Sequence, residues 1–84
     1  MGRIVLDLHD VFRDGDAIDA ALNGAIDRAV GKKIPLIEII PGKGSGQLRR
    51  RVIRFLHLPH VKDKWHRVEI DERNHGKVSV HFRF

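Results

Sequence analysis

Two short apolar segments, residues 3–9 and 36–40, lie on either side of one long amphipathic stretch, and this arrangement constrains the fold most. Both segments have the length and the branched side chains of buried strands. Between them, apolar residues recur at the three-and-four spacing of a helix, at Ile18, Leu22, Ala25, Ile26 and Ala29. Because a strand–helix–strand connection within one sheet is almost always right-handed, we expect two parallel strands joined by this helix.

The ends of this first helix carry signals of their own. Asp14 or Asp16 is expected to cap its start, and acidic residues there also suit the positive end of the helix dipole. Gly31 is the expected C-cap. Capping and solvation account for these aspartates, so we assign them no chemistry.

A second helix is predicted after a glycine-rich segment. Its apolar stripe is Leu48, Val52, Phe55 and Leu56, and it should end before Pro59. Beyond it, apolar and polar residues alternate over residues 65–70 and 78–84, which predicts a hairpin whose turn uses Asn74 and Gly76.

The predicted order of elements is therefore β-α-β-α-β-β. This order predicts an α+β domain in which two helices pack on a mixed four-stranded sheet, as a two-layer sandwich. With 84 residues, the chain should form a single domain, residues 1–84. It has no cysteine, which excludes disulfides, cysteine-liganded zinc and a thiol nucleophile. No apolar run approaches the length of a membrane span, so we expect a soluble, cytoplasmic protein.

Charge is distributed unevenly along the chain. The net charge is +5. Residues 1–31 hold three basic and six acidic residues, which gives −3, whereas residues 32–84 hold thirteen basic and five acidic residues, which gives +8. A basic second part favours an anionic partner such as nucleic acid.

Two polar motifs should meet at one end of the predicted sheet. Asp7 and His9 share one face of the first strand near its carboxyl end, and residues 42–46 follow the second strand. Because parallel strands end on the same side of a sheet, and ligands usually bind there, we expect these motifs to be neighbours.

The glycine-rich segment has the chemistry of a phosphate-binding loop. Its residues are Gly42, Lys43, Gly44, Ser45 and Gly46. Glycine permits close approach of a ligand, and the helix that follows offers free backbone amides and a positive dipole end. The spacing is not that of a nucleotide-hydrolysing P-loop. A tight connection without any ligand remains the alternative.

Basic residues continue into the second helix as Arg49, Arg50, Arg51 and Arg54. They would extend a phosphate-binding surface along a nucleic-acid backbone, although such a run is ordinarily just a solvated helix face. The six histidines give no convincing metal motif, because Pro59 interrupts His57 and His60. Trp65 is interpreted as a core or edge anchor, with a base-stacking platform as the alternative.

Asp7 and His9 also suggest acid–base chemistry. A carboxylate two residues before a histidine can orient the ring and raise its basicity, while Lys43 would stabilise charge on a phosphate. On spacing alone, an aspartate that caps a loop beside a solvated histidine is the simpler interpretation.

Together the two motifs resemble the Smr (small MutS-related) domain family. The residues that carry the resemblance are Leu6-Asp7-Leu8-His9 and Pro41-Gly-Lys-Gly-Ser-Gly-Gln-Leu-Arg49. The resemblance covers essentially the whole chain and implies a fold similar to the C-terminal domain of translation initiation factor 3. It also implies nucleic-acid binding and, as in several members, endonuclease activity on DNA or RNA. With its initial methionine and no ATPase region, the chain looks like the stand-alone bacterial kind.

Three residues depart from the family's pattern. Asp10 replaces a glycine, Pro41 replaces a histidine before the loop, and the glycine pair of the last turn is reduced to a single Gly76. The first two departures weaken the nuclease interpretation more than the binding one. A non-catalytic nucleic-acid-binding module and a small protein-interaction domain therefore stay open as alternatives.

The residues leave the substrate and the metal requirement open. On RNA, a 2′-hydroxyl would be the nucleophile and no metal would be obligatory, whereas on DNA a water nucleophile makes magnesium plausible. The sequence does not decide between DNA and RNA, and it gives neither the oligomeric state nor the pathway.

Overall fold

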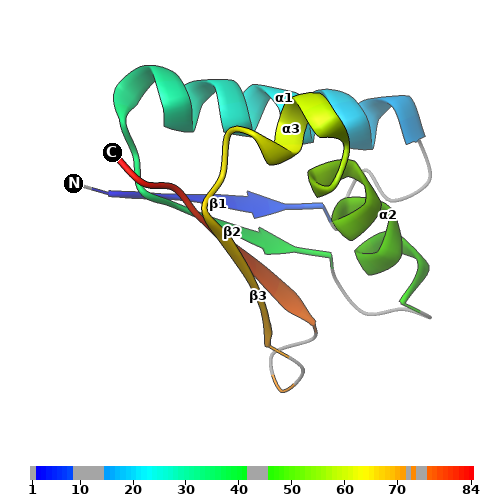
Figure 1. The fold of residues 1–84 in the computed structure, drawn as a ribbon. Coiled ribbons are helices and arrows are strands. Elements are labelled where there is room, and N and C mark those ends of the chain that lie inside the picture. Colours follow the sequence, from blue (N-terminus) through cyan, green and yellow to red (C-terminus); the bar gives the residue numbers. More distant parts are fainter. Residues whose placement is uncertain (1, 9–14, 42–45, 72, 74–75) are drawn as a thin grey trace.

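The computed structural model describes residues 2–8, 15–41, 46–71, 73 and 76–84 (Figure 1). Its elements follow one another as β1 (Arg3–Asp7), α1 (Gly15–Lys32), β2 (Leu36–Ile40), α2 (Gln47–Leu56), α3 (Pro59–Lys62), β3 (Arg67–Asp71) and β4 (Lys77–His81). The expected β-α-β-α-β-β order is confirmed, with the four-residue helix α3 as an addition.

The four strands form one mixed sheet in the order β1-β2-β4-β3. β1 and β2 are parallel, and β4 is antiparallel to both of its neighbours. Figure 1 shows the three helices on one side of the sheet. Fully buried side chains from both layers meet there, among them Leu22 and Leu56 from the helices and Ile37, Val78 and Val80 from the sheet. None of the described helices covers the other face of the sheet (Figure 1).

The ends of α1 differ from the sequence expectation. The helix begins at Gly15, so Asp16 lies in its first turn and is not its cap, while Asp14 lies outside the described residues. At the other end, Gly31 is still helical, and Lys33 is the left-handed residue, with a φ of 55°. The amide of Ile34 donates to the carbonyl of Ala29 at 2.8 Å and closes the helix.

Pro59 and Trp65 shape the segment after α2. Pro59 was expected only to stop the second helix, but it is also the first residue of α3, where proline's missing N–H costs nothing. The indole Nε1 of Trp65 donates to the carbonyl of Leu56 at 2.7 Å, and its ring packs against the core. The interpretation of Trp65 as an anchor is confirmed. Among the described helices, none has the length and apolar character to cross a membrane.

Candidate functional site

The carboxyl ends of β1 and β2 lie side by side, and we call this side of the molecule the carboxyl end of the sheet. Asp7 pairs with Ile40 in the parallel register. The amide of Leu8 donates to the carbonyl of Ile40 at 2.9 Å, so the pairing continues one residue past β1. Asp7 is thus adjacent to the last residue of the strand that leads into the glycine-rich segment. His9 and residues 42–45 (Gly42, Lys43, Gly44 and Ser45) lie outside the described residues.

Asp7 lies on the face of the sheet opposite the three described helices. Leu8 is fully buried and Ile4 is buried in the core, whereas Asp7 is exposed. This alternation follows from the two-residue period of a strand, as the sequence predicts. The carboxylate is therefore accessible to a ligand at the carboxyl end.

Helix α2 begins at the same end of the sheet, directly after a left-handed glycine. Gly46 has a φ of 87°, a conformation that glycine adopts without a steric penalty. Its carbonyl accepts from the amide of Arg50 at 3.0 Å, and the first turn of α2 contains no acidic residue. The positive end of the α2 dipole therefore faces this end without a carboxylate of the same turn beside it.

The four arginines of α2 take three different directions. Arg49 lies against the β3–β4 turn, where a methyl group at Gly76 would come within 3.0 Å of its Cδ and Nη1. Arg51 turns the other way, and its Nη2 lies 3.2 Å from a carboxylate oxygen of Asp19 in α1. Arg50 and Arg54 are exposed and make no ion pair with another described residue. The structure thus separates these arginines into two that contact neighbouring elements and two that face solvent.

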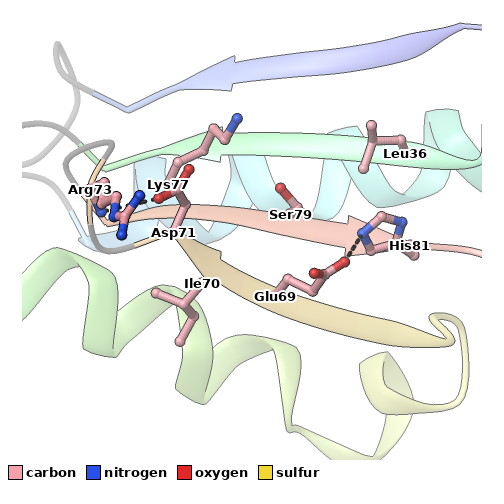
Figure 2. Close-up of a pocket in the computed structure, with 8 residues that line it drawn as sticks. All are labelled: Leu36, Glu69, Ile70, Asp71, Arg73, Lys77, Ser79 and His81. Atoms are coloured by element: carbon pink, nitrogen blue, oxygen red, sulfur yellow. Dashed lines mark hydrogen bonds and ion pairs between the residues drawn. The ribbon is translucent and has the colours of Figure 1, made fainter.

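The β3–β4 hairpin adds basic residues that the sequence analysis did not single out. The antiparallel register that pairs Ile39 with Val78 brings Lys77 level with Ile40, and so into one row with Asp7. Two strand spacings separate Asp7 from Lys77, which is roughly 10 Å. Arg73 lies in the turn beside Lys77, as Figure 2 shows. The predicted hairpin turn was a usable signal for these residues. Pairing that hairpin with β2 would have placed them at this end of the sheet.

A hollow of about 630 Å³ extends from these residues along β3 and β4 (Figure 2). It carries both signs of charge, because Glu69 and Asp71 line it together with Arg73 and Lys77. Nε2 of His81 lies 2.8 Å from a carboxylate oxygen of Glu69 at its far end. A polyanion is therefore better accommodated at the Lys77 end than along the whole hollow.

Metal ligands are not gathered in the described part of the chain. No three His, Asp or Glu side chains among residues 2–8, 15–41, 46–71, 73 and 76–84 lie close enough to hold an ion together. The described residues around Asp7 thus do not by themselves form a magnesium site. We derive no step through a metal ion.

Comparisons with known proteins bear on this geometry. Residues 6–83 match the model of the Smr domain, a span that begins just before Asp7 and ends beyond β4. A comparison with curated proteins found no match. Because the matched span includes both sequence motifs and every element from α1 to β4, the chain belongs to the Smr domain family.

Proposed function

We propose that this Smr domain binds nucleic acid at the carboxyl end of its sheet and cleaves a phosphodiester bond there. One observation carries the proposal: the register sets Asp7 beside Ile40, immediately before the segment that leads to the arginine-rich start of α2. An acid–base pair and a phosphate-binding segment would then share one end of the sheet.

Binding rests on the arrangement of charge. The start of α2 offers backbone amides, Arg50 and Arg54 extend from it into solvent, and Lys77 adds a cation from the hairpin. Each phosphate that these groups neutralise releases counterions from the nucleic acid, so affinity should fall steeply with salt. We assign Lys43 and the amides of residues 42–46 to binding of the scissile phosphate. Arg49 and Arg51 are assigned to the flanks of the same phosphate-binding surface.

The chemical step is assigned to Asp7 and His9 acting on RNA. His9 takes the proton from a 2′-hydroxyl, and the 2′-oxygen attacks the adjacent phosphorus. The bond from phosphorus to the 5′-oxygen breaks, and His9 returns the proton to that oxygen. Asp7 orients the imidazole and stabilises its charged form, while Lys43 stabilises the negative charge that develops on the phosphate. The products are a 2′,3′-cyclic phosphate and a 5′-hydroxyl.

The nature of the product ends tests this mechanism. Purified protein is incubated with labelled single-stranded RNA, duplex RNA and supercoiled plasmid, each with magnesium or with a chelator. We expect cyclic-phosphate ends on RNA in both conditions, and no cleavage where a 2′-deoxynucleotide replaces the reacting nucleotide. Asp7→Asn and His9→Ala should abolish cleavage but retain binding, because Asp7 is exposed and its replacement leaves the core intact.

A non-catalytic binding module is the second candidate, and the sequence favours it at two positions. Pro41, which is buried, stands where the family usually has a histidine, and Asp10 adds a negative charge directly after the first motif in the sequence. This candidate predicts salt-sensitive binding that Lys43→Ala weakens, without products on long incubation. Cleavage that persists unchanged in both Asp7→Asn and His9→Ala would instead show that the assigned residues are wrong.

A further inference from the structure

A second basic surface lies at the opposite end of the sheet from Asp7. A hollow of about 410 Å³ is lined there by Lys33, Pro35, His66, Phe82, Arg83 and Phe84, and we call it the end hollow. Figure 1 shows the C-terminal residues at this end, close to the turn that follows α1. None of the described residues of the two motifs lines it.

Two parallel aromatic rings form one wall of the end hollow. The rings of Phe82 and Phe84 are stacked, with centroids 5.9 Å apart and planes 6° from parallel. Phe82 is only 6% exposed, and its amide donates to the carbonyl of Pro35 at 2.8 Å, so the inner ring is fixed by the fold. Phe84 is 59% exposed, which leaves a large part of an aromatic ring open to solvent. A flat ring on a fixed support suits the stacking of another planar group.

The charged side chains that line the end hollow are basic. Lys33 and Arg83 line the end hollow, and none of the acidic residues that the structure describes does. A guanidinium nitrogen of Arg83 lies 2.9 Å from Nε2 of His66, which holds the arginine beside the rings. Cations next to an open aromatic face match a nucleic acid, whose bases stack and whose phosphates are negative.

Lys33 also holds an unusual backbone conformation. Its φ of 55° is left-handed, at a position after a helix where glycine is the common residue. A lysine there costs backbone strain, and such strain is found preferentially at functional positions. Lys33 occupies this strained position, and its side chain is one of the two cations of the end hollow.

We propose that the end hollow binds an unpaired nucleotide, with the base stacked on Phe84 and the adjacent phosphates held by Lys33 and Arg83. This inference rests on the proposed nucleic-acid binding and extends it to a second contact point. Helix α1, with 18 residues, runs from the carboxyl end to Lys33 and is about 27 Å long. At a stacked rise of about 3.4 Å, a single strand of about eight nucleotides covers that distance.

The test measures affinity for a fluorescein-labelled adenine RNA of about 12 nucleotides, long enough to reach both contacts. We expect Phe84→Ala to weaken binding about 5- to 150-fold, the range for loss of one stacked base, and Phe84→Trp to restore it. RNA should also quench the added indole fluorescence of Phe84→Trp. Val5→Ala, a change at an exposed apolar residue of the uncovered sheet face, is the matched control and should leave affinity unchanged.

The outcomes separate the two proposals. Wild-type affinity in Phe84→Ala, together with weakened binding in Lys43→Ala, would overturn the end hollow and leave the proposed function intact. No RNA binding by the wild-type protein would overturn both. Oligoglutamate that quenches the Phe84→Trp variant as strongly as RNA would also overturn the inference, since the surface would then select an acidic peptide. Thermal unfolding of each variant verifies that Phe84, being exposed, can be replaced without loss of the fold.

Discussion

Helices α1 and α2 begin at the same end of the sheet but carry opposite charge. The first turn of α1 contains Asp16, whereas the first turn of α2 contains no acidic residue and is followed by a run of arginines. Both helices direct the positive end of their dipole there. The difference shows that a helix start alone does not define the candidate anion site, because α2 combines its start with a left-handed glycine and with the exposed side chains of Arg50 and Arg54.

Core packing should attach the two helices to the sheet with similar strength. Leu22 of α1 and Leu56 of α2 are both fully buried. We expect Leu22→Ala and Leu56→Ala each to lower the free energy of unfolding by about 2 to 5 kcal/mol, because each leaves a cavity in the shared core. Chemical denaturation measures this loss. A much smaller loss for Leu56→Ala would break the equivalence and show α2 to be loosely attached.

Gly76 and Gly24 differ in whether the backbone conformation at the position requires glycine. Gly76 has a φ of 70° and contacts Arg49 of α2, so Gly76→Ala should cost about 1 to 2 kcal/mol of stability and displace that arginine. Gly24 is exposed in α1, with open space around it, so Gly24→Ala should stabilise the protein by about 0.5 to 1 kcal/mol. Thermal unfolding of the pair checks both signs, and a neutral Gly76→Ala would contradict the contact with Arg49.

The ion pair between the two helices should have the smallest effect. Arg51 and Asp19 are each more than 40% exposed, so Asp19→Asn should cost less than about 1 kcal/mol of stability. It also removes a negative charge beside the start of α2, and RNA affinity should therefore rise. The matched control is Asp27→Asn. Asp27 lies farther along α1, and its carboxylate pairs with Lys64. Equal gains in affinity from both variants would show that only net charge matters.

Periodicity was sufficient to predict most of the fold. The buried positions of α1, the strand over residues 36–40 and the hairpin follow from the two-residue and three-to-four-residue periods, which burial imposes directly. The helix ends were less predictable, because capping depends on local hydrogen bonds. Lys33 takes the left-handed position in place of Gly31, and Pro59 starts a helix that has too few apolar residues to show a period.

The candidate site was predictable only where it depends on strand order. The adjacency of Asp7 and the end of β2 follows from a right-handed connection between parallel strands. The different directions of Arg49, Arg50 and Arg51 do not follow from their spacing, since they depend on which elements flank α2. The end hollow was also missed, because Lys33, His66 and Phe84 are far apart in sequence and meet only in the folded chain.

The salt dependence of RNA binding tests the central claim, that nucleic acid meets the α2 start, most directly. Affinity for a single-stranded RNA is measured over a salt series for the wild-type protein, for the double variant Arg50→Gln and Arg54→Gln, and for Arg28→Gln. Arg28 is an exposed arginine in the second half of α1, so it is the control for loss of a positive charge elsewhere. We predict that the double variant lowers the slope of log affinity against log salt by about 1.4, or about 0.7 for each lost phosphate contact, and that Arg28→Gln leaves the slope unchanged. A wild-type slope in the double variant would contradict the claim.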